Sequence, residues 1–319
     1  MTLPDTLRIS TRGSLLARWQ AEFVAARLGH PAELRVVKSK GDRLQHVALQ
    51  GRTDQGFFTK EIQAALLTGD AEVAVHSLKD LPTVPTPGLT LAAVPERGVV
   101  EDVLLVHPDH HAPDRTLPVK AGGRIGATSL RRQSLLRHYA PDLEPTLLRG
   151  NVPTRLDRLR GGEFAAILLA RAGLRRLEAE VKGFLAFALD PKRWIPAPGQ
   201  AALGIETPAA GPVAAWVRAR LDHEPTRRAV ELERELMARF EAGCHAPFAA
   251  WVDVTGPHVV VRIGAGTDAG GWAEARVEAA DAASASDAAW EALNRARVEN
   301  RGPGAAAGQE SPCQPISSF

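Results

Sequence analysis

Short apolar segments of strand length alternate with segments of helical periodicity along the first part of the chain. Residues 7–11 predict a buried strand, and the next helix is expected to begin after Ser14 and to end at Gly29. The order then repeats, with a strand at 34–37, a helix at 60–67 and strands at 72–76 and 89–94. Strands that alternate with helices favour a mostly parallel sheet covered on both faces. The chain is therefore predicted to be an α/β protein.

A second unit with the same order of elements is expected to begin near residues 96–101. Its predicted strands are 102–106, 124–127, 146–149 and 165–170, and its helices are expected to begin near Ser129, Thr154 and Ala172. The stiff, proline-containing segment 194–199 is expected to lead the chain back to the first unit. A length of 319 residues leaves room for two or three domains of ordinary size.

The sequence becomes acidic and rich in alanine from about Asp222 onward. A helix at 227–241, strands at 249–254, 258–263 and 273–278, and a helix at 283–297 predict a small α+β domain. The glycines between the last two strands favour a hairpin over a dinucleotide-binding loop. We therefore expect domain 1 at 1–98 with 196–219, domain 2 at 99–195, domain 3 at 220–300, and a disordered tail at 301–319.

The net charge of +2 conceals an uneven distribution of charge along the chain. Residues 124–176 hold eleven arginines, no lysine and four acids, which gives +7, whereas residues 222–300 have a net charge of −6. A guanidinium group presents a rigid fork of donors that suits carboxylates and phosphates. Several arginines follow predicted strands and open helices, where an open α/β sheet binds its ligands. This pattern predicts a cleft for a small polyanion.

A nucleic acid is the main alternative partner for such an arginine-rich segment. The basic stretch contains only Tyr139 and Phe164 as aromatic residues, and no helix-turn-helix or RNA-binding signature is visible. No nucleic-acid partner is therefore predicted. The absence of an apolar run of about 18 residues excludes a membrane helix, and the absence of a secretory signal favours a cytoplasmic protein.

Two residues are candidates for covalent or acid–base chemistry. Asp80 follows a predicted strand inside the expected cleft, where a carboxyl group can act as a general acid or base; the alternative is an ordinary turn aspartate. Cys244 follows a helix at a glycine-bearing turn, and the alternative is a buried structural cysteine. The only other cysteine is Cys313, which excludes a disulfide framework. The histidines at 107, 110 and 111 lack a metal-ligand spacing, so no metal site is predicted.

Seven sequence blocks add a more specific signal. They are RISTRGSLLARWQ (8–20), GFFTKE (56–61), VHSLKDLP (75–82), SLRRQ (129–133), LRGNVPTRL (148–156), IPAPGQAALGIE (195–206) and GCHAP (243–247). In this order they resemble the porphobilinogen deaminase family, also called hydroxymethylbilane synthase. The resemblance implies two α/β domains, each similar to half of a periplasmic binding protein, and a small α+β C-terminal domain.

The resemblance also implies a reaction and a set of site residues. The family joins four porphobilinogen molecules head to tail with release of ammonia and then hydrolyses the linear product from the enzyme. A dipyrromethane cofactor is expected on Cys244 through a thioether, and Asp80 is the expected catalytic residue. The expected cofactor contacts are Ser77, Lys79, Thr128, Ser129, Arg131, Arg132 and Gly150. The expected substrate contacts are Arg12, Ser14, Gln20, Lys60, Arg149, Arg155, Arg176 and Gln200.

The rival hypothesis is a non-catalytic anion-binding protein on the same periplasmic-binding-protein architecture. A secreted receptor would carry a signal segment and a regulator would carry a DNA-binding helix pair, and the sequence shows neither. We therefore expect a cytoplasmic, monomeric transferase whose partner is the small molecule porphobilinogen.

Overall fold

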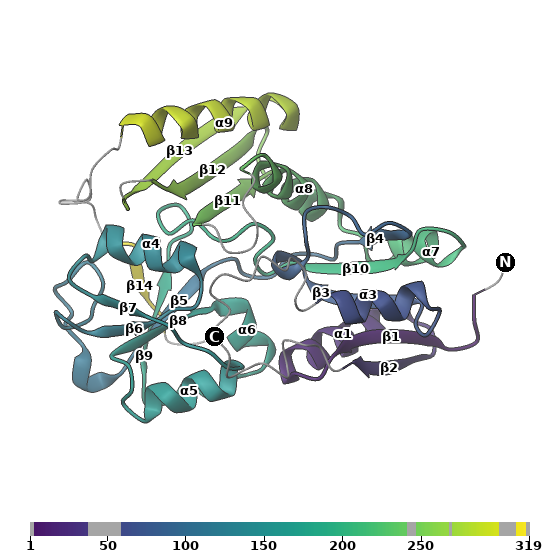
Figure 1. The fold of residues 1–319 in the computed structure, drawn as a ribbon, viewed down its shortest axis with the longest axis horizontal. Coiled ribbons are helices and arrows are strands. Elements are labelled where there is room, and N and C mark those ends of the chain that lie inside the picture. The colour runs from purple at the N-terminus through teal and green to yellow at the C-terminus, as the bar shows by residue number, and fades with distance from the viewer. Residues whose placement is uncertain (1–2, 38–58, 241–246, 268–269, 300–310, 317–319) are drawn as a thin grey trace. The chain divides into compact units, whose positions relative to one another are not determined.

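The computed structural model describes residues 3–37, 59–240, 247–267, 270–299 and 311–316 (Figure 1). These residues divide into two compact units. Unit 1 contains residues 1–98 and 199–234, and unit 2 contains residues 99–198 and 235–319. The chain therefore passes from one unit to the other at three points along its length.

Unit 1 is built on a five-stranded sheet in the order β2-β1-β3-β10-β4. Its strands are β1 (Leu7–Arg12), β2 (Ala32–Val37), β3 (Val73–Ser77), β4 (Leu89–Ala93) and β10 (Leu203–Pro208). β1 runs parallel to β2 and β3, whereas β10 runs antiparallel to both of its neighbours. β1, β2, β3 and β4 therefore all run in the same direction, which confirms the expectation of a mostly parallel sheet, and only β10, a strand that the sequence did not reveal, runs against them between β3 and β4.

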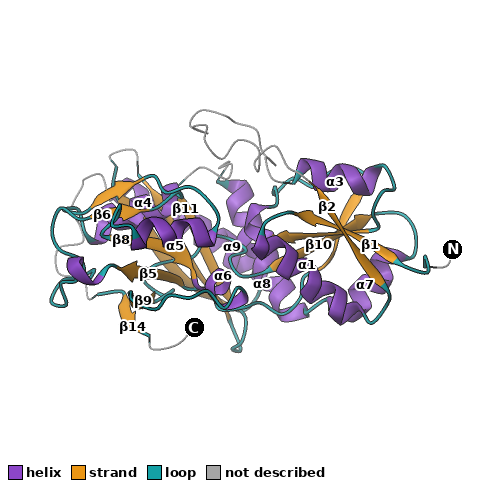
Figure 2. Cartoon of the chain, turned by 90° about the horizontal axis from the view of Figure 1, so that it is seen from below, coloured by secondary structure: helices purple, strands orange, loops and turns teal. Residues whose placement is uncertain are grey.

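Helices cover both faces of this sheet, as Figure 2 shows. On one face α1 (Leu15–Leu28) and α7 (Val213–Leu221) pack over Val73 and Val75. On the other face α3 (Lys60–Leu67) packs over Ala74. Successive residues of β3 therefore face opposite layers, as the two-residue period of a strand requires. The predicted boundaries of α1 are confirmed: Ser14 caps its start by accepting a hydrogen bond from the Ala17 amide, and Gly29 ends it in the left-handed conformation with φ +62°.

Unit 2 contains a six-stranded sheet in the order β14-β9-β5-β8-β6-β7. Its strands are β5 (Asp102–Val106), β6 (Arg124–Gly126), β7 (Glu144–Thr146), β8 (Ala166–Ala170), β9 (Leu185–Leu189) and β14 (Cys313–Pro315). β6 runs parallel to β7 and β8, while β5 runs antiparallel to β8 and β9. α4 (Leu130–Tyr139) covers one face, and α5 (Val152–Arg160) and α6 (Arg171–Arg176) cover the other. The strand predicted at 146–149 lies at 144–146, because Leu148 is buried in the loop before α5.

The C-terminal part of unit 2 confirms the predicted α+β region. β11 (Phe248–Asp253), β12 (Val259–Gly266) and β13 (Trp272–Ala279) form an antiparallel sheet, and α9 (Ala282–Glu299) packs against it. β12 and β13 form the hairpin that the glycine-rich segment predicted. The expected disorder of residues 301–319 was wrong for residues 313–315, which form β14 because their backbone completes the edge of β9.

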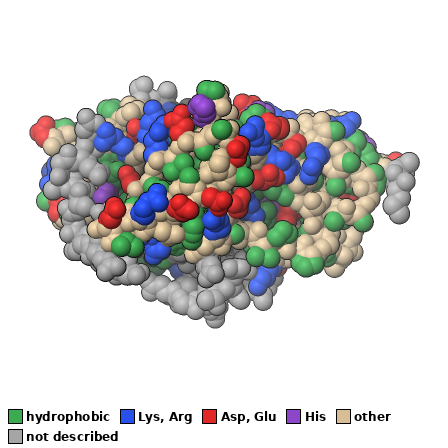
Figure 3. Space-filling view, turned by 90° about the horizontal axis from the view of Figure 1, so that it is seen from above, with side chains coloured by type: hydrophobic (Ala, Val, Ile, Leu, Met, Phe, Trp, Pro, Cys, Tyr) green, Lys and Arg blue, Asp and Glu red, His purple; other side chains and the backbone are tan. Residues whose placement is uncertain are grey.

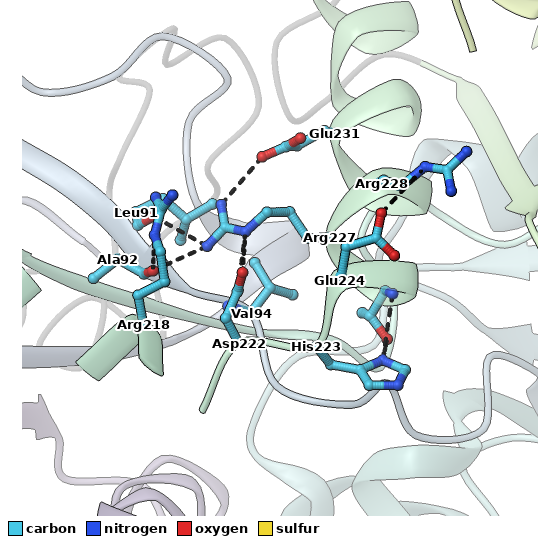
Figure 4. Close-up of polar contacts among 11 residues, drawn as sticks. Leu91, Ala92, Val94, Arg218, Asp222, His223, Glu224, Arg227, Arg228 and Glu231 are labelled. Carbon is cyan, nitrogen blue, oxygen red and sulfur yellow. Dashed lines mark hydrogen bonds and ion pairs between the residues drawn. The ribbon is translucent and has the colours of Figure 1, made fainter. Parts of the chain in front are cut away.

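Helix α8 (Glu224–Arg239) begins in unit 1, and Figure 4 shows how that end is anchored. The Asp222 carboxylate accepts a hydrogen bond from the Val94 amide and two from Nε of Arg227. The Arg227 guanidinium in turn donates to the carbonyl of Ala92, in β4. The start of α8 is thus fixed to the sheet of unit 1 by charge-assisted hydrogen bonds, which are stronger than neutral ones.

The surface of the C-terminal region carries both signs of charge. Figure 3 shows basic and acidic side chains interspersed on the face that it presents. Arg239 pairs with Asp287, Arg276 pairs with Glu278, and Arg295 lies 3.8 Å from Glu291 one helical turn away. Among the described residues, no helix is both long and apolar enough to cross a membrane.

Candidate active site

A pocket in unit 1 brings several of the predicted residues together. β1 and β3 are adjacent parallel strands, so their carboxyl ends lie at one edge of the sheet. Arg12 ends β1, and Asp80 lies in the short 3-10 helix η1 (Leu78–Asp80) that follows β3. The pocket is lined by Arg12, Ser14, Leu16, Ala17, Gln20, Thr59, Ile62, Val75, His76, Ser77 and Asp80. Five predicted site residues therefore share one cavity.

Hydrogen bonds between α1 and β3 fix the floor of this pocket. Gln20 is buried, and its side-chain amide donates to the Ser77 hydroxyl over 2.9 Å. Ser77 ends β3 and immediately precedes η1. The contact therefore ties the segment that carries Asp80 to the first helix, whose N-terminus opens on the same cavity through Ser14. The carboxylate of Asp80 is exposed to solvent.

The turn at residues 199–202 supports η1 from the other side. The Leu78 amide donates to the Ala202 carbonyl over 3.0 Å, and Nζ of Lys79 lies 3.4 Å from Oε1 of Gln200. Gly199 has φ +70°, and a Cβ atom there would lie 3.2 Å from the Lys79 amide nitrogen. Only glycine meets both demands without strain, which explains the PGQ sequence at this turn.

Arg97 and Glu233 hold this turn in place. Arg97 donates to both carboxylate oxygens of Glu233, over 2.6 and 2.9 Å, and its Nε donates to the Gln200 carbonyl over 2.8 Å. The Glu233 carboxylate also accepts a hydrogen bond of 2.7 Å from the Gly199 amide. Neither residue could be predicted from the sequence, because no motif links positions 97 and 233.

A second buried pair, which no sequence pattern predicted, lies beneath the pocket. Nε2 of His76 lies 3.0 Å from Oε2 of Glu206, and the Gln63 amide donates to the same oxygen over 2.9 Å. Both His76 and Glu206 are buried, although His76 also contacts the cavity. Lys60 begins α3, next to Thr59 in the pocket wall, but it does not itself line the cavity.

In unit 2 the remaining predicted residues lie at the carboxyl ends of three parallel strands. Thr128 and Ser129 follow β6, and Ser129 is the N-cap residue of α4. Arg149 and Gly150 follow β7, Arg155 lies in α5, and α6 with Arg176 follows β8 directly. The Thr128 hydroxyl donates to the Leu148 carbonyl, which joins the first two of these loops. The strand-end rule thus correctly grouped Thr128, Ser129, Arg149 and Gly150 at one edge of the sheet, whereas Arg176, which only the family resemblance implied, lies at the far end of α6.

Gly150 adopts a backbone conformation that few other residues could adopt. Its φ is +107°, and an added Cβ would lie 2.9 Å from Cγ2 of Thr154. Its carbonyl accepts a hydrogen bond of 2.7 Å from Nε of Arg155. The neighbouring Asn151 caps α5 by accepting a hydrogen bond from the Thr154 amide. Gly150 therefore sets the geometry of a loop that carries two arginines.

Arg131 and Arg132 occupy a more buried environment than the sequence suggested. Arg131 donates to Asp102 over 2.7 Å, and Arg132 donates to both oxygens of the same carboxylate. The indole N–H of Trp194 donates to it as well. Burial alone would raise the pKa of Asp102, but the two guanidinium charges hold this pKa well below its usual range. Burial also lowers the pKa of the half-buried Arg176 to about 10.

Of the two cysteines, Cys313 lies within the described residues and Cys244 does not. Cys244 lies outside the described residues, so its predicted attachment to the cofactor stays a prediction. Cys313 lies in β14, and burial raises the pKa of its thiol to about 12. Among the described residues, no group of three or more histidine, cysteine, aspartate or glutamate side chains could hold a metal ion.

Comparison with known proteins shows which protein family this chain resembles. Residues 7–213 match the family model described as porphobilinogen deaminase, dipyromethane cofactor binding domain. The porphobilinogen deaminase of Nitratidesulfovibrio vulgaris strain DP4 is 44% identical over 256 residues, which cover 78% of this chain and 79% of that protein. The enzyme of the same name from Moorella thermoacetica is 41% identical over 80% of this chain and 82% of its own length.

A solved structure is similar at a much lower level. The periplasmic VFT2 domain of BvgS from Bordetella pertussis has a TM-score of 0.39 and 14% identity, over 68% of this chain and 86% of that one. The family assignment rests instead on the match to the family model and on the identity with curated relatives. On these grounds the chain belongs to the porphobilinogen deaminase family.

Proposed function

We propose that this chain is a transferase that joins four porphobilinogen molecules head to tail, releases ammonia at each addition, and hydrolyses the product to hydroxymethylbilane. The observation that carries the proposal is the pocket in which the exposed carboxylate of Asp80 faces the same space as Arg12, Ser14 and Gln20. We also propose that the enzyme is cytoplasmic and monomeric.

The polar side chains of this pocket suit the substrate. Porphobilinogen carries acetate and propionate groups, and a guanidinium such as that of Arg12 can bind a carboxylate through two parallel hydrogen bonds. The Ser14 hydroxyl and the N-terminus of α1 add donors beside it. Lys60, Arg149, Arg155, Arg176 and Gln200 are proposed to bind further carboxylates of the substrate or of the growing chain.

Asp80 is proposed to stabilise the positive charge that forms during the condensation and to accept the proton that the new bond releases. Breaking the bond to the aminomethyl nitrogen produces ammonia and leaves a positive charge on the pyrrole, which the carboxylate of Asp80 can stabilise electrostatically. Forming the new carbon–carbon bond releases a proton from the attacking ring, and a carboxylate can accept it. An exposed side chain on a short, well-supported helix can serve both steps without moving the backbone.

The described residues also fit the dipyrromethane cofactor, which carries carboxylate groups. Nε of Arg131 is buried and has no hydrogen-bond partner among the described residues, so it keeps a donor for an anion. Ser129 at the N-terminus of α4, together with Thr128, Arg132 and Gly150, would complete that contact. Ser77 and Lys79 are proposed as further cofactor contacts. When bound at Cys244, the cofactor supplies the primer to which pyrrole rings are added.

The pocket itself argues against the rival hypothesis of a non-catalytic anion-binding protein. A receptor for anions gains nothing from an exposed carboxylate beside its arginine, because like charges repel. An enzyme that must stabilise a cation during each turnover does need that group. Asp80 therefore favours the catalytic hypothesis.

Intact-mass spectrometry of the purified chain tests the proposal. We expect a mass above that of the bare 34.1 kDa chain by one dipyrromethane group, with further increments after incubation with porphobilinogen. Cys244→Ser should lose normal thioether attachment, whereas Cys313→Ser, the matched control, should keep it. A wild-type chain that stays at its bare mass after incubation with porphobilinogen would refute the proposal.

A further inference from the structure

The segment 311–316 completes the sheet of unit 2 although it is separated from α9 in the sequence. Residues 313–315 form β14, which pairs with β9 in the register Cys313 with Leu189, Gln314 with Ala188 and Pro315 with Phe187. Figure 2 shows β14 beside β9 at the edge of that sheet. β9 pairs with β5 on its other side, so without this segment β9 would be the edge strand.

Backbone hydrogen bonds extend this pairing beyond β14 at both ends. The Asp190 amide donates to the Pro312 carbonyl over 2.9 Å, and the Ile316 amide donates to the Ala186 carbonyl over 3.0 Å. In an antiparallel pair the hydrogen-bonded positions recur at every second residue. Gln314, midway between Pro312 and Ile316, therefore points its N–H and C=O groups toward Ala188.

Side chains fix the segment on both faces of the sheet. Cys313 packs against the core cluster that contains Leu104 and Leu189, and Ile316 packs against the cluster on the opposite face that contains Val103 and Leu105. The Ser311 hydroxyl donates to the Thr116 carbonyl over 2.5 Å, which anchors the start of the segment. The segment 311–316 is thus packed and hydrogen-bonded as an ordered part of unit 2.

The outer edge of β14 offers no amide to a further strand. The alternation that directs Gln314 toward β9 directs positions 313 and 315 outward. The Cys313 amide is already donated to the Ser311 hydroxyl over 3.1 Å, and Pro315 has no N–H group. Proline and locally satisfied amides are means by which proteins end a sheet.

The edge of β9 that β14 covers has no such protection against pairing with a further strand. β9 has the sequence LAFAL, with no charge and no proline, and Leu185 remains 37% exposed. An uncovered apolar edge strand of this kind pairs readily with another copy of itself. We propose that the segment 311–316 is an intramolecular edge cap that prevents a second copy of this chain from pairing with β9.

Truncation gives the direct test. A chain that ends at Glu310 should sediment with a concentration-dependent increase in mass relative to the full chain at equal concentration. A synthetic peptide of residues 311–319, added in trans, should reverse that increase, whereas the same peptide with Gln314→Pro should not. Identical sedimentation of the truncated and full chains would overturn the proposal.

A pair of point variants keeps the test decisive if the truncated chain fails to fold. Gln314→Pro removes the donor that faces Ala188, and Gln314→Thr, at the same exposed position, keeps it. Hydrogen exchange at the Asp190 amide should become at least about tenfold faster in Gln314→Pro and stay unchanged in Gln314→Thr. Equal protection of Asp190 in the two variants would show that the segment does not cap β9.

Discussion

Arg97 and Glu233 form a two-pronged ion pair inside unit 1, with hydrogen bonds of 2.6 and 2.9 Å and side chains that are 10% and 0% exposed. Each residue also holds the turn that supports η1, Arg97 through the Gln200 carbonyl and Glu233 through the Gly199 amide. The pair is therefore linked to the position of Asp80 although neither residue lines the pocket.

We predict that Glu233→Gln destabilises the protein by about 3 kcal/mol or more, because it leaves the Arg97 charge buried without a counter-charge. Turnover should also fall, since the turn at 199–202 loses its anchor. Glu231→Gln on the same helix is the control, because Glu231 is 55% exposed. Urea unfolding and steady-state kinetics of both variants provide the measurement, and equal effects of the two changes would contradict the prediction.

Asp80→Asn should lower turnover by about 10²- to 10⁴-fold, the usual contribution of a general acid or base. The thermal midpoint should hardly change, because Asp80 is exposed. Asp109→Asn, whose side chain is 84% exposed outside the pocket, should leave both quantities unaltered. Wild-type turnover in Asp80→Asn would remove this residue from the mechanism.

Asp102→Asn should cost about 3–5 kcal/mol at neutral pH, because it leaves two buried guanidinium groups without their counter-charge. Asp142→Asn, which breaks the more exposed pair with Arg115, should cost at most about 1 kcal/mol. Denaturant unfolding of the two variants at pH 7 compares these costs.

The pH dependence of stability gives a second readout of Asp102. Its pKa is depressed in the folded state, so its contribution is complete above the unfolded value of about 3.9 and is lost as the pH falls toward the folded value. The stability difference between wild type and Asp102→Asn should therefore shrink below about pH 4. A difference that stays constant between pH 7 and pH 3 would argue against this assignment.

Gly150→Ala should weaken binding of porphobilinogen and raise KM, because the added Cβ would displace Thr154 and disturb the carbonyl that holds Arg155. Backbone strain should add a stability cost of about 1–3 kcal/mol. Gly162→Ala is the control, since Gly162 has φ +73° but no atom within 4 Å of the added Cβ. Both variants should lose stability, but only Gly150→Ala should change KM.

Local patterns predicted much of the fold. The bounds of α3 and β5 follow the predicted ranges residue for residue, because each segment has one clear periodicity and a turn at its end. β10 was missed because Glu206 lies in its middle, and a charged residue argues against a buried strand. The carboxylate of Glu206 contacts Gln63 and His76, which come from distant parts of the sequence. Such burial becomes favourable only in the assembled sheet.

The candidate site likewise contains some residues that sequence patterns predicted and others that they did not. The rule that ligands bind at strand ends placed Arg12 and Asp80 together, because it requires only the order of strand and loop. It gave no indication that Asp102 would bind Arg131 and Arg132, because that contact depends on which strands are neighbours. The supporting pair Arg97 and Glu233 lies 136 residues apart in the sequence and carries no motif.

The central place of β10 has a consequence for biosynthesis on the ribosome. β10 lies between β3 and β4, yet its residues are translated after the whole of 99–198. During synthesis, β3 and β4 therefore lack the strand that joins them until about a hundred further residues have been translated. Until then, the apolar groups that Leu203 and Ile205 later cover remain exposed. Cells that make this enzyme rapidly should thus depend on a chaperone to hold the unfinished sheet during synthesis.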